Sequence, residues 1–82
     1  MHGYSYVYIL VSLADPSMHY TGLTDDLAAR LRKHNEGGCV HTAKGRPWRV
    51  ETAVAFRDRD KAAAFEKYLK THSGRAFAAR HF

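Results

Sequence analysis

The sequence predicts a small α+β domain: a three-stranded, largely antiparallel sheet flanked by helices, in the order β-β-α-β-α-α. Three observations support this class. Two apolar runs are joined by a turn signal within residues 6–23, residues 48–56 alternate with a period of two, and three other segments have helical spacing between capping signals. With 82 residues the chain is long enough for one domain, so we expect residues 1–82 to fold as a single unit.

The first two strands are predicted to form a hairpin. Within residues 6–11, two interleaved sets of side chains point to opposite faces: Tyr6, Tyr8 and Leu10 on one, and Val7, Ile9 and Val11 on the other. Asp15-Pro16-Ser17 is typical of a type I turn, so Met18–Leu23 should return antiparallel. Tyr8 and Tyr20 would then be neighbours, either as half-buried core residues or as functional ones.

The first helix is expected over Leu27–His34, with Thr24 as its N-cap and Gly37-Gly38 as its end. The next eleven residues, Gly37–Pro47, contain three glycines and a proline and are predicted to form a long loop.

The third strand is predicted over residues 48–56, with its even-numbered side chains on one face: Trp48, Val50, Thr52, Val54 and Phe56. A second helix, Lys61–Thr71, should be capped by Asp58 or Asp60. Gly74 either ends that helix or, with Ser73 as N-cap, opens a last helix over Arg75–His81.

Composition narrows the function classes. Thirteen Lys and Arg against eight Asp and Glu give a net charge of +5, which favours a polyanionic partner such as nucleic acid. The single cysteine, Cys39, excludes an intrachain disulfide and fits a reducing cytoplasmic location. Zinc is disfavoured because the histidines are scattered, and neither a signal peptide nor a membrane span is expected.

One acidic side chain, Glu66, falls by helical spacing on the apolar face of its helix. A buried carboxylate needs a partner, a proton or a cation, because leaving it unpaired is costly. The alternative is an ion pair with Lys70, four residues further along the helix.

Arg30 and His34 share a helix face with two leucines. A guanidinium there suits a phosphate group, and an imidazole can relay a proton near neutral pH. The alternatives are an arginine whose stem covers the leucines and a helix-end histidine beside the last carbonyls.

Five segments, in order, resemble the motifs of the GIY-YIG nuclease superfamily across nearly the whole chain. They are Tyr6-Val7-Tyr8, Tyr20-Thr21-Gly22, the segment 22–35, Arg46-Pro47-Trp48 and the segment 65–77. The pattern is similar to small, stand-alone bacterial members of the excinuclease C N-terminal and UPF0213 type. Tyr6 replaces the name-giving glycine, and Thr21 replaces an isoleucine. His72 and Ser73 stand where many members have an asparagine.

The resemblance implies a metal-dependent endonuclease that hydrolyses phosphodiester bonds in nucleic acid, with DNA the expected substrate. It implies active-site tyrosines at Tyr8 and Tyr20, a phosphate-stabilising Arg30 and an auxiliary His34. Glu66 would be the sole protein ligand of Mg²⁺ or Mn²⁺, which suits magnesium because this ion keeps several waters. One of the two tyrosines would accept a proton from the attacking water, once Arg30 and the cation lower its pKa from about 10.

Exposed basic residues would contact backbone phosphates without reading bases: Arg32, Lys33, Lys44, Arg46 and Arg49. The alternative function is a nucleic-acid-binding module that keeps the fold and does not cleave. A third possibility is a protein-interaction domain whose basic charge is incidental.

Overall fold

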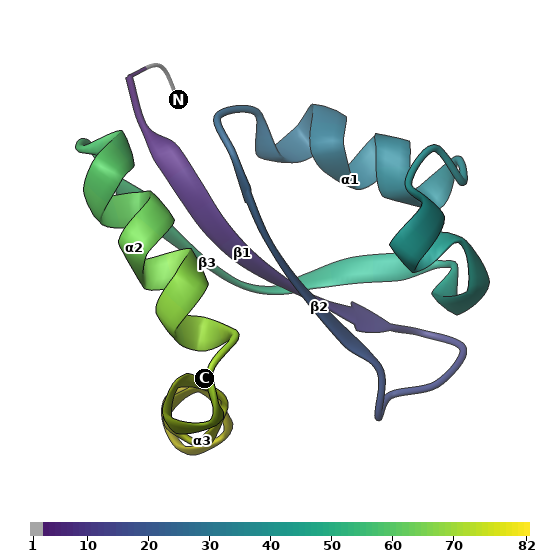
Figure 1. The fold of residues 1–82 in the computed structure, drawn as a ribbon. Coiled ribbons are helices and arrows are strands. Elements are labelled where there is room, and N and C mark those ends of the chain that lie inside the picture. The colour runs from purple at the N-terminus through teal and green to yellow at the C-terminus, as the bar shows by residue number, and fades with distance from the viewer. Residues whose placement is uncertain (1–2) are drawn as a thin grey trace.

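The computed structural model describes residues 3–82 and confirms the predicted α+β class (Figure 1). Its elements are β1 (Ser5–Ser12), β2 (His19–Thr24), α1 (Leu27–Asn35), a 3₁₀ helix η1 (Val40–Gly45), β3 (Trp48–Phe56), α2 (Arg59–Leu69) and α3 (His72–His81). The three strands are antiparallel in the order β2-β1-β3, so β1 is central. No helix in the described part of the chain has the length and apolar character of a membrane span.

The predicted hairpin is confirmed. The amide of Met18 donates to the carbonyl of Asp15 at 2.9 Å, which closes the turn, and the Asp15 carboxylate accepts from the amide of Ser17 at 3.1 Å. The register pairs Tyr8 with Gly22 and Leu10 with Tyr20. Cross-strand partners share a face, so the side chains of Tyr8 and Tyr20 lie on the same side of the sheet.

The bounds predicted for β3 are confirmed, but the single-face assignment was wrong. Leu10 pairs with Val50 whereas Ile9 pairs with Thr52, so one extra residue, Glu51, forms a bulge. A bulge shifts the alternation by one position. Residues before it, including Trp48, therefore pack with Tyr8 and Leu10, whereas Phe56 packs on the opposite face.

Three local predictions also need correction. Asp26, not Thr24, caps α1, because its carboxylate accepts from the amide of Ala29 at 3.1 Å while Thr24 remains in β2. The predicted loop contains η1, in which Thr42 is fully buried. Thr71 rather than Ser73 caps α3, because its hydroxyl accepts from the amide of Gly74, so α3 begins earlier than expected. Asp58 caps α2, which was one of two predicted options.

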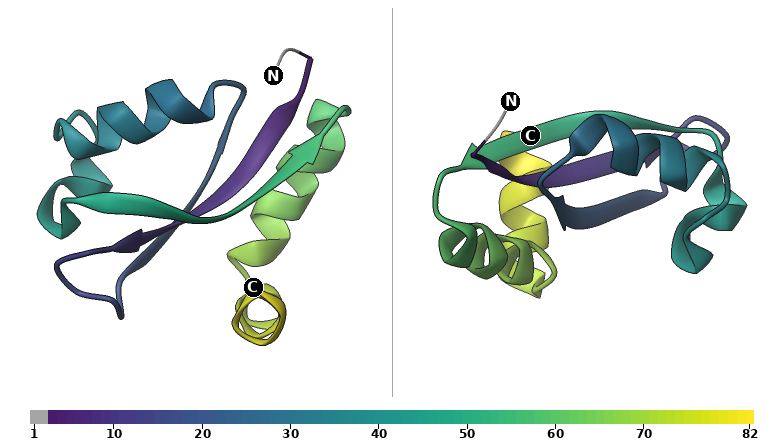
Figure 2. Two further views of the ribbon diagram at one scale, coloured as in Figure 1. Left: turned by 180° about the vertical axis from the view of Figure 1, so that it is seen from behind. Right: turned by 90° about the horizontal axis from the view of Figure 1, so that it is seen from above.

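Two apolar clusters lie on opposite faces of the sheet. On one face Val7 and Ile9 pack with Ala62 and Leu69 of α2, and α3 adds Phe77. On the other face Tyr8, Leu10 and Trp48 pack with the leucines of α1. Figures 1 and 2 show α1 and η1 on one side of a strongly twisted sheet and α2 with α3 on the other.

Gly74 sets the position of α3 against α2. A Cβ atom built on Gly74 would collide with the backbone carbonyl of Tyr68 and would crowd the Cα atom of Leu69. Backbone atoms in a packed helix end cannot rotate away as a side-chain tip can. The two helices can therefore meet at this angle only with glycine here.

We expect Gly74→Ala to lower the free energy of unfolding by about 3 kcal/mol, near the upper end of overpacking effects. Urea unfolding monitored by circular dichroism measures it. Gly38→Ala is the matched control, because its Cβ would meet mainly the flexible Lys33 side chain. Equal stability of Gly74→Ala and wild type would contradict this account of the helix crossing.

Candidate active site

Tyr8 lies at the centre of the site because β2 carries a glycine opposite it. A Cβ atom at Gly22 would collide with the hydroxyl and ring carbons of Tyr8. Because Gly22 has no Cβ, the Tyr8 ring packs directly against it and is only 1% exposed. The second motif therefore supplies both the neighbouring Tyr20 and the space for Tyr8.

A buried chain of hydrogen bonds runs from Tyr8 into η1. The Tyr8 hydroxyl lies 2.9 Å from Nε2 of His34, and Nδ1 of His34 lies 2.7 Å from the hydroxyl of Thr42. All three side chains are at most 1% exposed. The helix-end alternative for His34 was therefore wrong, since the ring is buried between two side chains.

The hydrogen bond that the Thr42 hydroxyl makes to the backbone decides which group is the donor in each bond of this chain. The Thr42 hydroxyl donates to the carbonyl of Cys39 at 3.4 Å, which leaves it as an acceptor for Nδ1–H of His34. A neutral imidazole with its proton on Nδ1 has a free acceptor at Nε2. That nitrogen accepts from the Tyr8 hydroxyl, so Tyr8 is the proton donor of the pair.

Tyr20 and Arg30 complete the cluster. The ring centroid of Tyr20 lies 6.4 Å from that of Tyr8 and 5.0 Å from that of His34. Tyr20 is half-buried, on the outer strand of the sheet. The Arg30 side chain, also half-buried, lies close enough to Tyr8 to lower the pKa of its hydroxyl. The structure therefore brings four of the five predicted catalytic residues together.

The electrostatics of the cluster keep both buried groups neutral. Burial, reinforced by the neighbouring Tyr20, raises the pKa of Tyr8 from 10.0 to about 12, although the charge and hydrogen bond of Arg30 oppose that rise. Burial lowers the pKa of His34, and the charges of Arg30 and Lys33 lower it further. Tyr8 therefore stays protonated near neutral pH, and His34 stays uncharged and able to accept a proton.

Glu66 lies outside this cluster. Its side chain is 23% exposed and pairs with the ammonium group of Lys70 at 3.1 Å, which was the alternative considered from the sequence. Within residues 3–82, no hydrogen bond or ion pair joins Glu66 to Tyr8, Tyr20, Arg30 or His34. No group of three potential ligands for a metal ion occurs in the described residues.

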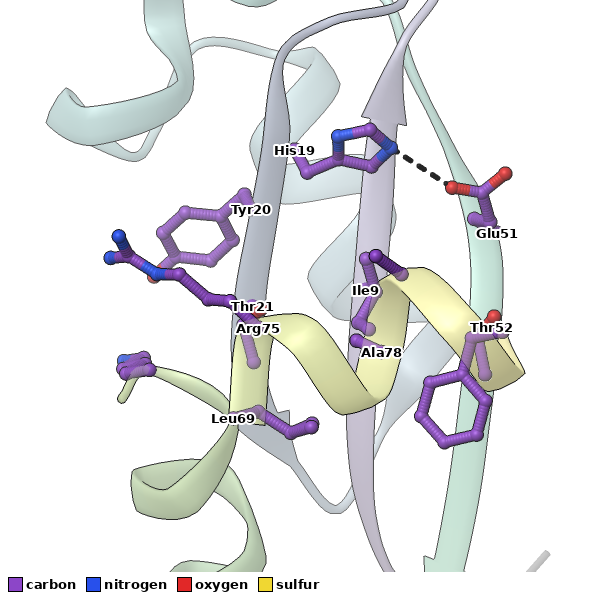
Figure 3. A pocket seen from close by; sticks show the side chains of 12 residues that line it. Ile9, His19, Tyr20, Thr21, Glu51, Thr52, Leu69, Arg75 and Ala78 are labelled. Atoms are coloured by element: carbon purple, nitrogen blue, oxygen red, sulfur yellow. Dashed lines mark hydrogen bonds and ion pairs between the residues drawn. The ribbon is translucent and has the colours of Figure 1, made fainter. Parts of the chain in front are cut away.

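A cavity of about 680 Å³ lies between the sheet and α3, and Figure 3 shows it from close by. Tyr20 lines it together with Lys70, the partner of Glu66, so Glu66 stands one contact away from the cavity. The remaining lining includes Arg75 of α3, which sequence reasoning did not assign to the site. The predicted phosphate contacts are exposed but none lines the cavity: Arg32, Lys33, Lys44, Arg46 and Arg49.

Sequence reasoning also missed the supports of the site. Asn35 binds the backbone of Trp48 twice, accepting from its amide at 2.6 Å and donating to its carbonyl at 3.0 Å. The Trp48 indole in turn donates to the carbonyl of Thr42 at 2.7 Å. Asn35 could have been noticed beside His34, whereas Thr42 lies in an apparent loop and gives no sequence signal.

These observations define a small α+β domain with a buried tyrosine–histidine–threonine chain and a second tyrosine at the sheet edge. The family model of the GIY-YIG catalytic domain matches residues 4–79. The chain therefore belongs to the GIY-YIG family.

Curated relatives agree with this assignment. A UPF0213 protein of Haloquadratum walsbyi is 36% identical over 74 residues, which cover 89% of this chain and 81% of that protein. A UPF0213 protein of Lacticaseibacillus paracasei is 41% identical over 66 residues, covering 79% and 72%.

The structure-specific endonuclease subunit SLX1 of Malassezia globosa is 35% identical over 79 residues, which cover 90% of this chain. The chain spans only 18% of the length of that relative.

We expect stability to fall as the pH drops below 6.5, the ordinary pKa of histidine. The pKa of His34 is lower in the folded state, so acid protonates the unfolded chain first and the folded state loses its advantage. Urea unfolding at a series of pH values between 7.5 and 5 measures this. His34→Gln should flatten the dependence, and His41→Gln, which alters an exposed histidine, should not. An unchanged slope in His34→Gln would contradict the assignment.

Proposed function

We propose that this domain is an endonuclease that hydrolyses phosphodiester bonds in nucleic acid, with DNA as the substrate. The observation that carries the proposal is the convergence of Tyr8, Tyr20, His34 and Arg30 in a chain of the GIY-YIG family. The similarity to SLX1, a structure-specific endonuclease subunit, supports the same activity. The net charge of +5 suits a polyanionic substrate.

In this proposal Tyr20 first loses its hydroxyl proton to solvent through the open cavity, and its phenolate oxygen then accepts a proton from the attacking water. Tyr20 is half-buried and lines the open cavity, whereas Tyr8 is closed off from solvent. The raised pKa of Tyr8 also makes it a poor base near neutral pH. Tyr8 instead holds its proton toward His34 and keeps the ring of Tyr20 in place.

Arg30 is the group proposed to stabilise negative charge on the phosphate as it is attacked. A guanidinium presents several donors in a fixed plane, which matches phosphate oxygens. Its side chain is half-buried and has no carboxylate partner within the described residues, so its charge is uncompensated there. A donor that meets the charge only in the transition state accelerates the chemical step.

The residues present fit a single Mg²⁺ or Mn²⁺ held by Glu66. Its carboxylate is accessible, and its pair with the 52% exposed Lys70 is of the surface kind that contributes about 0–1 kcal/mol. Magnesium needs only one or two protein carboxylates because water and phosphate fill the other positions. When bound, such an ion supplies Lewis-acid stabilisation of the phosphate oxygens.

Purified protein with Mg²⁺ or Mn²⁺ and a mixture of branched, flap and single-stranded DNA should give cleavage products. Arg30→Ala should reduce kcat by roughly 10²–10³, as loss of one transition-state donor does. Glu66→Gln should abolish the metal-dependent part of the activity. Arg59→Ala and Glu36→Gln, both exposed and outside the site, serve as controls. Undiminished cleavage by Arg30→Ala and Glu66→Gln would refute the mechanism, and binding without cleavage would favour the non-cleaving module.

The two tyrosines should differ in phenotype. Tyr20→Phe should lower kcat at least 10²-fold while leaving stability and DNA affinity near wild type, because general bases contribute roughly 10²–10⁴. Tyr8→Phe should instead lower the free energy of unfolding by about 1–3 kcal/mol, since Nε2 of His34 loses its buried partner. Single-turnover cleavage and urea unfolding separate the two effects. Equal kcat in Tyr20→Phe and wild type would exclude Tyr20 as the base.

A further inference from the structure

The cavity between the sheet and α3 has one wall built from a single helix face. Arg75, Ala78 and Ala79 of α3 line it together with the C-cap residue Phe82, and their spacing of three, four and seven residues places them on one side of the helix. Seven residues of helix span about 10 Å, so Arg75 and Phe82 stand near opposite ends of this wall. The wall therefore has a cation at one end and an aromatic ring at the other.

Arg75 is an uncompensated cation beside the proposed catalytic residue. Its guanidinium has no hydrogen-bond or ion-pair partner within residues 3–82. Figure 3 shows its side chain extending from α3 toward the ring of Tyr20. Lys70 also lines the cavity, with its ammonium group paired with Glu66, so Arg75 is the cation of the lining that has no acidic partner. The one acidic side chain of the lining, Glu51, is paired with His19 at 3.0 Å, so the end of the cavity near Arg75 suits an anion.

The rest of the lining is suited to an apolar, flat group. Ile9, Leu69 and Ala78 contribute aliphatic surface, and Phe82 is 43% exposed, which leaves its ring open to contact. The volume of about 680 Å³ is that of a small-ligand site and cannot admit a double helix. An unpaired nucleotide, with its phosphate near Arg75 and its base against the apolar wall, has the matching chemistry.

We propose that this cavity binds an unpaired nucleotide of the substrate strand, with Arg75 contacting its phosphate and Phe82 stacking on its base. The proposal rests on the proposed function, because it takes the substrate to be nucleic acid. It adds a substrate class: strands with unpaired nucleotides next to the cleavage site. Arg75 and Phe82 are thus residues that select single-stranded structure, and neither takes part in the chemical step.

The test measures binding without metal, so that it is independent of cleavage. Fluorescence anisotropy in EDTA at low salt compares labelled oligothymidylate, oligouridylate and a blunt DNA duplex of equal length. We expect wild type to bind the single strands at least tenfold more tightly than the duplex. The DNA and RNA arms identify which strand the site prefers.

Comparing Arg75→Ala with Arg80→Ala distinguishes a contact in this cavity from a general effect of positive charge on nucleic-acid binding. Both arginines are exposed on α3 and both changes remove one positive charge, but only Arg75 lines the cavity. Arg75→Ala should weaken single-strand binding about tenfold. It should also reduce the magnitude of the slope of log K against log salt concentration by about 0.7. This is the contribution of one phosphate contact on a single strand. Arg80→Ala should change the single-strand affinity and the salt slope by much less.

Phe82→Ala tests the aromatic end. It should weaken oligothymidylate binding about fivefold or more, in line with loss of one stacked base, and should leave an abasic oligonucleotide unaffected. Arg75→Ala should weaken the binding of oligothymidylate and of the abasic oligonucleotide equally.

Equal effects of Arg75→Ala and Arg80→Ala, or tighter binding of duplex than of single strands, would overturn the nucleotide site while leaving the proposed endonuclease standing. Failure of wild type to bind any of the three nucleic acids at low salt would overturn both.

Discussion

The buried hydrogen-bond chain from Tyr8 through His34 to Thr42 is the constraint on which the rest of the site depends. It joins the central strand to the end of α1, 26 residues further along the chain, and then to η1, the next element after α1. Each group is shielded from water, so each must find its partner inside the protein. Within residues 3–82, no buried side-chain nitrogen or oxygen lacks one. Replacing one of these residues would leave its neighbour buried without a hydrogen-bond partner, so single substitutions in such a chain are costly.

Glycines create the space in which these side chains lie. Gly22 leaves room for the Tyr8 ring, and Gly45 leaves room for Trp48, whose ring a Cβ atom would strike. The Trp48 indole then binds the carbonyl of Thr42, which connects the second glycine to the same hydrogen-bond chain. Both glycines therefore matter because they leave space for a neighbouring ring, and not because of a special backbone conformation, since neither has a positive φ.

The period-two alternation of side chains and the turn residues between the first two strands were enough to predict the sheet. β3 has the alternation of a half-buried strand and its bounds were predicted correctly, whereas β1 is an apolar run that is buried on both faces. The bulge at Glu51 was not predictable, because one extra residue leaves the local alternation of residue types unchanged. Neighbouring capping residues were confused because several polar residues compete at each helix start. Thr42 could not be found because its role comes from a contact with His34, eight residues away across a glycine-rich connection. Glu66 was placed on the right helix, but spacing alone could not distinguish a core carboxylate from an edge ion pair.

The charges around Tyr20 explain how the fold and the basic composition are connected. Arg30 and Arg75 have no acidic partners in the described residues, whereas Glu66 and Glu51 are already paired with Lys70 and His19. Each face of the sheet therefore carries a cation without an acidic partner: Arg30 of α1 beside Tyr8 on one face, and Arg75 of α3 in the cavity that Tyr20 also lines on the other. Such an arrangement costs stability through self-repulsion, and a bound polyanion relieves it. Tyr20 is the residue where the buried chain on the α1 face and the open cavity on the α3 face meet. The proposed function therefore places the substrate phosphate at Tyr20, between Arg30 on the α1 face and Arg75 on the α3 face.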